Sequence, residues 1–234
     1  MQLFYDPDLQ SGIHPLRAEE AAHAFRVLRK RVGDELDLVN GRGGWFKGVV
    51  TAISKRECLL DVVAVREETE RTDHQVHLYV APTKNIDRFE WILEKATEIG
   101  VDLIQPIVTQ HSERKRIRND RLNRVLESAM KQSLRAWLPR LEELLPFEEA
   151  VLRQHLNYAS YIAYLGEANT PLLRDRYEKG DSVSIFIGPE GGFSPAEAKT
   201  ILDTDGEYVS LGPNRLRTET AAIAAVHTIE QLNW

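Results

Sequence analysis

The most constraining feature of this sequence is an abrupt passage from strand to helix through glycine. The apolar run SVSIFI (182–187) is typical of a buried strand, and GPEGGF (188–193) follows it directly. Ser194 and Pro195 then suit the N-cap and first position of a helix, and Glu197 completes a capping box. A tight structural turn would explain one or two of these glycines. The whole stretch favours a loop whose backbone closely approaches a ligand, because parallel α/β folds bind ligands beyond the carboxyl ends of their strands.

The same alternation of strand and helix extends from about residue 75 to the end of the chain. It favours a mostly parallel sheet with helices on both faces. The predicted strands are VHLYVA (76–81), LIQPIV (103–108), YASYIAYL (158–165), SVSIFI (182–187) and EYVSL (207–211). The predicted helices span 85–99, 119–136, 146–155, 171–178, 195–204 and 218–231.

The first seventy residues have a different pattern. After a helical stretch at 18–30 come alternating segments separated by turns, with Asn40-Gly41 as a hairpin signal. This pattern favours a small β-barrel or sandwich. The polar run REETERTDH (66–74) is typical of a linker, so we expect one domain over 1–70 and a second over 71–234.

Composition excludes several classes of protein. The net charge of −6 argues against a general polyanion binder, and the single cysteine, Cys58, excludes a disulfide framework and favours a packing role. We expect a cytoplasmic protein without a membrane helix or a metal site. One segment is locally basic: six of the twelve residues in 113–124 are Arg or Lys. Such a segment is either a phosphate-contacting ridge or a solvated helix face.

The familiar nucleotide and hydrolase motifs are absent from the sequence. There is no P-loop, no dinucleotide fingerprint, no HExxH and no serine nucleophile elbow. Two further loops instead repeat the pattern of the first, because Gly166 follows one predicted strand and Gly212 follows another. In the second of these, Thr218 or Thr220 is the expected cap of the last helix. Three glycine-containing strand ends in one sheet predict a cofactor pocket that needs no phosphate-binding group.

Four stretches carry a family resemblance. FIGPEGGFSPAE (186–197) and LGPNRLRTETA (211–221) resemble the SPOUT-class RNA methyltransferases, and among them the 16S ribosomal RNA uracil-N3 methyltransferase family. KNIDRFEWILEKATEIGVDLIQPI (84–107) and HAFRVLRKRVGDELDLVNG (23–41) agree with it, so the resemblance covers nearly the whole chain. It implies an α/β protein with an N-terminal PUA-like RNA-binding β-barrel and a C-terminal SPOUT domain, whose parallel sheet is tied in a trefoil knot. It also implies a homodimer that acts on 16S ribosomal RNA or the small ribosomal subunit.

The resemblance further implies S-adenosylmethionine as the cofactor. The residues that it assigns to the cofactor are Leu165, Gly166, Ile187, Gly188, Pro189, Gly191, Leu211, Gly212, Leu216 and Arg217. Two stretches depart from the family pattern. Pro213-Asn214 replaces a pair that often contains Arg or Glu, and 132–135 replaces a glycine-containing stretch. Glu190 is expected to orient its loop rather than to act in catalysis.

Methylation of uracil N3 requires removal of the N3 proton or stabilisation of the uracil anion. Arg217 is the candidate for stabilising that negative charge, because a guanidinium stays protonated. Glu219 is the candidate proton acceptor, and pairing with Arg217 is its alternative role. The candidates for contacts with the RNA backbone are Arg17, Arg26, Arg29, Lys84, Arg114, Arg116 and Arg135.

Two other functions stay open at this point. A different SPOUT methyltransferase, for example one acting on transfer RNA ribose, would share the pocket but not the stretch HAFRVLRKRVGD (23–34). A non-catalytic RNA-binding or assembly factor on the same scaffold would not bind S-adenosylmethionine.

Overall fold

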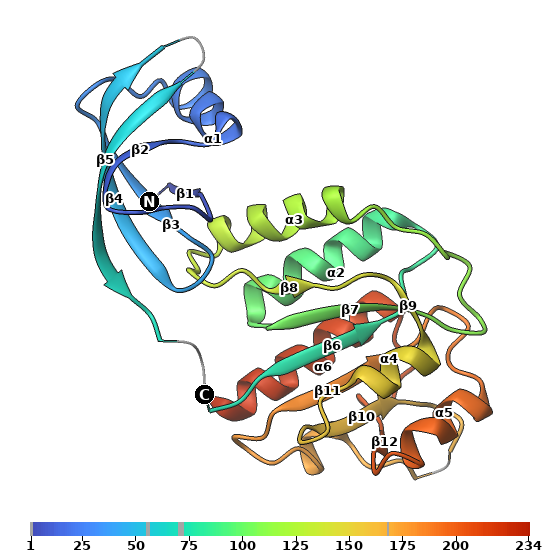
Figure 1. Cartoon of the computed structure of the whole chain (residues 1–234). Helices are drawn as coiled ribbons and strands as arrows, with labels where there is room; N and C mark the ends of the chain where they lie inside the picture. The colour runs from blue at the N-terminus through green and yellow to red at the C-terminus, as the bar shows by residue number, and fades with distance from the viewer. Residues whose placement is uncertain (1, 55–56, 70–72, 168) are drawn as a thin grey trace. The chain divides into compact units, whose positions relative to one another are not determined.

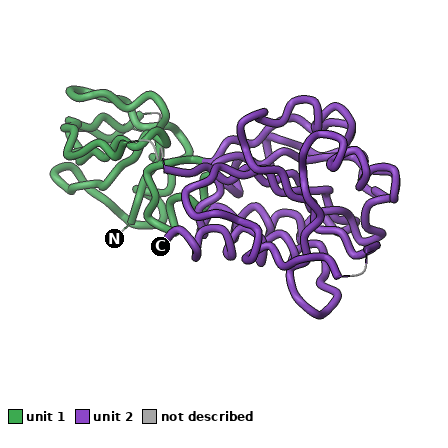
Figure 2. The backbone as a smooth tube through the Cα atoms, turned by 90° about the horizontal axis from the view of Figure 1, so that it is seen from below, with its two compact units in different colours: residues 1–70, 127–138 green, residues 71–126, 139–234 purple. Residues whose placement is uncertain are grey.

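A computed structural model describes residues 2–54, 57–69, 73–167 and 169–234 of the chain. It divides into two units, one of residues 1–70 with 127–138 and one of residues 71–126 with 139–234 (Figure 2). The sequence predicted the whole of 71–234 as one domain, whereas the structure joins 127–138 to the first unit. The reason is packing between distant parts of the chain: Met130 and Ala136 are buried in a cluster with apolar residues of the N-terminal strands.

The first unit contains a five-stranded sheet in the order β1-β3-β4-β5-β2. Strands β1 and β3 pair in parallel, and the remaining pairs are antiparallel. A short helix α1 (Ala18–Ala22) continues as a π-helical turn (His23–Val27) where the sequence predicted a helix over 18–30. The strands span Leu3–Tyr5 (β1), Gly12–Pro15 (β2), Glu35–Val39 (β3), Gly44–Ile53 (β4) and Cys58–Glu67 (β5). The alternating segments of the sequence, DELDLV (34–39), GWFKGVVTAI (44–53) and ECLLDVVAV (57–65), are therefore confirmed as β3, β4 and β5, and the two short strands β1 and β2 were missed.

Local chemistry explains the turn between β3 and β4. The Asn40 side-chain oxygen accepts hydrogen bonds from the backbone N–H groups of Arg42 and Gly44, each at 2.9 Å. Gly41 and Gly43 have positive φ values of 72° and 88°, which glycine adopts without a steric penalty. The predicted hairpin at Asn40-Gly41 is thus confirmed. Cys58 is fully buried in the core of this unit, as its packing role requires.

The second unit is built on a parallel sheet in the order β12-β10-β11-β6-β7-β8, and β9 also pairs with β7 (Figure 1). Every strand pair described in it is parallel. The strands span Val76–Val80 (β6), Leu103–Val108 (β7), Arg140–Leu141 (β8), Leu145–Pro146 (β9), Ala159–Ala163 (β10), Val183–Ile187 (β11) and Glu207–Val209 (β12). The predicted parallel α/β sheet is confirmed.

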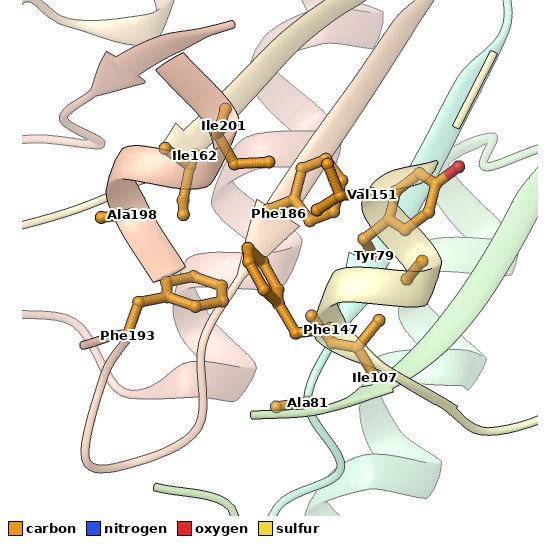
Figure 3. Close-up of a cluster of buried hydrophobic side chains, with 11 residues drawn as sticks. Tyr79, Ala81, Ile107, Phe147, Val151, Ile162, Phe186, Phe193, Ala198 and Ile201 are labelled. Carbon is orange, nitrogen blue, oxygen red and sulfur yellow. The ribbon is translucent and has the colours of Figure 1, made fainter. Parts of the chain in front are cut away.

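Helices cover both faces of this sheet (Figure 1). Helices α2 (Ile86–Ile99) and α6 (Thr218–Asn233) pack against each other, and α6 lies on β6 and β11. Helices α4 (Phe147–Arg153) and α5 (Pro195–Leu202) pack together against β7 and β10. Between the last two helices and the sheet lies a buried cluster that includes Tyr79, Phe147, Phe186, Phe193 and Ile201 (Figure 3).

Three predicted elements differ from the structure. The helix predicted at 171–178 is a single 3-10 turn, Leu173–Asp175. Helix α3 (Asn119–Gln132) ends four residues before the predicted 136, because Leu134 takes a left-handed φ of 54° that ends a helix. The linker predicted at 66–74 lies partly outside the described residues, and its first part is strand, because β5 continues to Glu67.

One buried side chain predicts a pH dependence of stability. Burial, followed by the charges of Arg140 and His155, lowers the pKa of His77 from 6.5 to about 4. Between these values the unfolded chain binds a proton that the folded chain does not, so the stabilisation is complete above pH 6.5 and is lost as the pH falls toward 4. We expect this group alone to reduce the free energy of unfolding by about 2 kcal/mol between about pH 7 and about pH 5.

The measurement is denaturant unfolding of the wild-type protein and of His77→Phe at both pH values. The variant keeps an aromatic ring against Tyr158, whose ring centroid lies 4.8 Å from that of His77. It should lose less stability than the wild type on acidification. An equal loss in both proteins would contradict the assignment.

Candidate functional site

A cavity of about 500 Å³ opens at the carboxyl ends of the adjacent strands β12, β10 and β11. Its volume falls within the range of about 300–1,000 Å³ that is usual for ligand pockets. The loop after each of these strands contributes to its wall. The cavity is lined by Ala163, Tyr164, Leu165, Gly166, Ile187, Gly188, Pro189, Glu190, Gly191, Gly192, Phe193, Val209, Leu211, Gly212, Asn214, Arg215, Leu216, Thr218 and Ala221.

The structure thus brings together the three loops that the sequence singled out. All the predicted cofactor residues except Arg217 line this cavity. The sequence missed the last residues of the strands themselves, Ala163 and Val209, and the aromatic residue Tyr164. Their position at strand ends is the signal that could have identified them. A Cβ atom at Gly166 would collide with the ring of Tyr164, so the absence of a side chain there lets the ring lie close to the loop.

Close packing explains the glycines of the loop after β11. A Cβ atom at Gly188 would lie 3.1 Å from the ring of Phe193, which is buried in the core beneath the loop (Figure 3). At Gly191 a Cβ atom would lie 2.8 Å from the Cβ atom of His111, whose ring contacts the carbonyl oxygen of Gly192 at 3.1 Å. The loop therefore packs against the buried ring of Phe193 and against the side chain of His111.

Glu197 anchors the end of the same loop. Ser194 and Glu197 form the predicted capping box, in which each side chain accepts from the other residue's backbone N–H. The second oxygen of the buried Glu197 carboxylate accepts a hydrogen bond from the backbone N–H of Gln110 at 2.7 Å. This bond ties the loop that follows β7 to the start of α5.

The start of α6 differs from the prediction. Arg217 is the N-cap residue and makes no side-chain cap bond, whereas Thr218 and Thr220 were the expected caps. The hydroxyl of Thr218 instead donates to the carbonyl oxygen of Gly188 at 3.1 Å. Since Thr218 is buried and lines the cavity, this contact joins the first turn of α6 to the loop after β11.

The two predicted catalytic residues lie outside the lining of this cavity. Arg217 is exposed. One carboxylate oxygen of Glu219 lies 3.5 Å from a guanidinium nitrogen of Arg88, and the other is buried without a hydrogen-bond partner among the described residues. The alternative partner considered for Glu219, Arg217, is therefore not the one found in the structure.

The predicted RNA-contacting residues of the second unit differ in how far their charges are already paired within the protein. The Arg114 guanidinium donates to the carbonyl oxygens of Thr83 and Lys84, at 3.0 and 2.6 Å. The Lys84 ammonium is 2.8 Å from the carboxylate of Glu113, and this pairing raises the pKa of Lys84. Arg116 is exposed. Within the basic segment, Arg114 thus stabilises the backbone of a neighbouring turn, whereas the charge of Arg116 is accessible.

The remaining basic candidates belong to the first unit. The guanidinium of Arg17 lies 3.5 Å from the carboxylate of Glu127 and 5.3 Å from the centre of the Tyr5 ring, so part of its charge is already paired within the protein. Arg26 and Arg29 are exposed, and Arg135 is half-buried.

The sequence places Arg121, Arg124, Lys131 and Arg135 in a cationic stripe along α3 and just after it, and this stripe is partly neutralised. Arg121 pairs with Glu90, and Lys131 pairs with Glu20. Fewer charges of this helix are therefore available to an RNA backbone than the sequence predicted.

The described residues contain no cluster of His, Cys, Asp or Glu side chains suited to a metal ion. None of the helices in the described part of the chain has the length and apolarity to span a membrane.

Comparisons with known proteins agree with this fold and cavity. The model of the RNA methyltransferase domain matches residues 70–230, and the model of the RNA methyltransferase PUA domain matches residues 16–63. These two matches, over the parallel α/β unit with its glycine-lined cavity and over the N-terminal unit, show that the chain is an RNA methyltransferase with a PUA-like domain. The chain belongs to the ribosomal RNA small subunit methyltransferase E family.

Members of this family resemble the chain over most of its length. The protein of that name from Rickettsia conorii is 30% identical over 88% of this chain and 84% of its own. The one from Bacillus subtilis is 27% identical over 92% of this chain and 88% of its own.

Solved structures also resemble this chain over nearly its whole length. A probable rRNA methyltransferase from Porphyromonas gingivalis is 40% identical, with a TM-score of 0.90 over 100% of this chain and 98% of that one. A Legionella pneumophila protein solved with bound S-adenosylmethionine is 26% identical, with a TM-score of 0.88 over 99% of this chain and 97% of that one.

Proposed function

We propose that this protein transfers a methyl group from S-adenosylmethionine to N3 of a specific uridine in 16S ribosomal RNA. The observation that carries the proposal is the cavity formed by three loops at neighbouring strand ends, in a chain whose family members are named as small-subunit ribosomal RNA methyltransferases.

The lining of the cavity fits S-adenosylmethionine. This cofactor carries no phosphate, and Arg215 is the only cationic side chain among the described residues that line the cavity. Aliphatic side chains such as Leu165, Ile187 and Leu211 offer apolar walls for an adenine ring. Glycine at positions 188 and 212 leaves the wall of the cavity without a Cβ atom there, so a ligand can approach the backbone closely.

In this proposal the bound cofactor supplies an electrophilic methyl group on a sulfonium sulfur. The chain must then orient the uracil and accommodate the loss of its N3 proton, because neutral N3 is a poor nucleophile. We assign the stabilisation of the uracil anion to Arg217, whose planar guanidinium can donate two hydrogen bonds to carbonyl oxygens. Glu219 is the proposed proton acceptor.

Both proposed catalytic residues lie outside the cavity lining of their own chain. A homodimer, which the family resemblance implies, would allow a second copy to supply the exposed Arg217 to the bound RNA, whereas Glu219 would first have to leave Arg88. We also propose that the sheet is tied in a trefoil knot of the SPOUT type, and that the first unit is an RNA-binding barrel. A ribosomal RNA substrate would place the protein in the cytoplasm.

N3 lies on the base-pairing edge of uracil, so the target uridine must be unpaired or flipped out of a helix to react. Of the seven predicted basic residues, Arg114 is occupied by the Thr83 and Lys84 carbonyl oxygens and Lys84 is paired with Glu113, so we assign the contacts that hold the RNA to the other five. Arg26, Arg29 and Arg116 are exposed and are the first to test.

A labelling experiment tests the proposed function. Small ribosomal subunits from cells that lack the enzyme are incubated with the protein and labelled S-adenosylmethionine, and mass spectrometry then maps the modified nucleotide. We expect one uridine of 16S ribosomal RNA to become methylated at N3. Methylation of a ribose in transfer RNA would support a different methyltransferase, and absence of cofactor binding would support a non-catalytic RNA-binding role.

A further inference from the structure

Glu190 is the one acidic side chain among the described residues that line the cavity. Its carboxylate oxygen Oε1 accepts a hydrogen bond from the backbone N–H of Lys84 at 3.0 Å. Its own carbonyl oxygen lies 3.5 Å from a guanidinium nitrogen of Arg215, in the loop after β12. Glu190 therefore connects its loop to two others, one after β6 and one after β12.

The Thr83-Lys84 turn that Glu190 contacts is also held by a second charged side chain. Arg114 donates to both carbonyl oxygens of this turn, at 3.0 and 2.6 Å. Thr83 is fully buried, and its hydroxyl donates to the carbonyl oxygen of Asn85, the N-cap residue of α2. The turn is thus fixed to the start of α2 and joined to one acidic and one basic side chain.

Glu190 and Arg114 come from two loops that are expected to bind different molecules, the cofactor and the RNA. Glu190 belongs to the proposed cofactor loop, and Arg114 begins the basic stretch RKRIR at 114–118. They meet at the backbone of the turn, where Glu190 binds an N–H group and Arg114 binds carbonyl oxygens. The turn therefore contributes to the position of the basic loop relative to the cofactor loop, beside the direct contacts that Gln110 makes with Glu197 and His111 with Gly192. Charge-assisted hydrogen bonds of this kind are about twice as strong as neutral ones.

We propose that Glu190 is a positioning residue, which acts through the Thr83-Lys84 turn to align the basic loop that begins at Arg114 with the cofactor cavity. The proposal rests on the proposed methyl transfer to RNA and adds a residue that relates the two binding surfaces. Because a displacement of about 1 Å can reduce a rate by about 100-fold, a loss of this alignment should affect turnover even though Glu190 donates no proton.

The proposal separates the hydrogen-bonding role of Glu190 from its charge. Glu190→Gln retains a side-chain oxygen that can accept from Lys84, whereas Glu190→Ala removes it. We expect Glu190→Ala to lower kcat/KM for the RNA substrate by at least about tenfold and Glu190→Gln to retain most of the activity. If the carboxylate instead acts by its charge on a cationic ligand, both variants should lose activity equally, and that result would overturn the proposal.

A double-mutant comparison tests the route through the turn. Since Glu190 and Arg114 act on the same turn, Glu190→Ala combined with Arg114→Ala should be only about twofold worse than the less active single variant. Arg26 lies in the other unit, so the effects of Glu190→Ala and Arg26→Ala should multiply. If the losses of activity caused by Glu190→Ala and Arg114→Ala also multiply, the proposal is overturned.

Hydrogen–deuterium exchange gives a readout that does not depend on activity. The amide of Lys84 and the segment 113–116 should exchange faster in Glu190→Ala than in the wild type and in Glu190→Gln. Unchanged exchange would overturn the positioning role whether or not the protein methylates RNA. Faster exchange in a protein that transfers no methyl group would instead leave the positioning role standing and contradict the proposed function.

Discussion

Gly191→Trp is expected to abolish the binding of S-adenosylmethionine. Gly191 lines the cavity, and a Cβ atom at this position would lie 2.8 Å from the Cβ atom of His111, so the loop must move before any larger side chain is accommodated. The indole would then occupy space within the cavity or displace its wall. We expect the affinity to fall by about 100-fold or more, equivalent to about 3 kcal/mol. Isothermal titration calorimetry measures this directly.

Ala196→Trp provides the matched control. Ala196 is exposed in the first turn of α5, a few residues further along the same segment, and does not line the cavity. The variant introduces the same indole without obstructing the ligand, so binding should be retained. Wild-type affinity in Gly191→Trp would remove this loop from the cofactor site.

Arg217→Ala is expected to reduce methyl transfer while leaving cofactor binding intact. Removal of one group that stabilises a developing anion typically lowers kcat by about 100- to 1,000-fold. Because Arg217 is exposed and does not line the cavity, the affinity for S-adenosylmethionine should change by no more than about twofold. Single-turnover kinetics with labelled cofactor and titration calorimetry separate the two quantities.

Two further variants sharpen this test. Arg217→Lys keeps the positive charge but loses the planar pair of donors, so it should recover only part of the rate. Arg174→Ala removes an exposed arginine from the same unit that has no assigned role and should leave the rate unchanged. Substantial turnover in Arg217→Ala would contradict the catalytic role.

Most of the second unit could be predicted because its elements are strongly periodic. The buried run at 183–187 and the amphipathic segment at 86–99 were both identified within a residue or two of their observed bounds. The prediction of a helix at 171–178 is wrong, since a short segment with a few apolar residues can satisfy a helical pattern without forming more than one turn. Strands β1 and β2 are only three and four residues long, too short for their alternation to be detected.

The candidate site could be predicted in its backbone but not in its side-chain contacts. Glycine after a predicted strand marks a loop in the sequence, and all three such loops line the cavity. The bond from Thr218 to Gly188 and the bond from Lys84 to Glu190 join residues that lie far apart in the chain. No local pattern carries such information.

The sequence by itself determined the parallel α/β class, the three glycine-containing strand ends and the family. These follow from periodicity, capping chemistry and quoted motifs, all of which are local. Only the tertiary structure decided that residues 127–138 join the first unit, that Arg114 supports a turn instead of standing free, and that Arg217 and Glu219 lie outside the cavity of their own chain. The physical reason is that buried apolar contacts and charge-assisted hydrogen bonds depend on which residues the fold brings together, and chain order does not specify those neighbours.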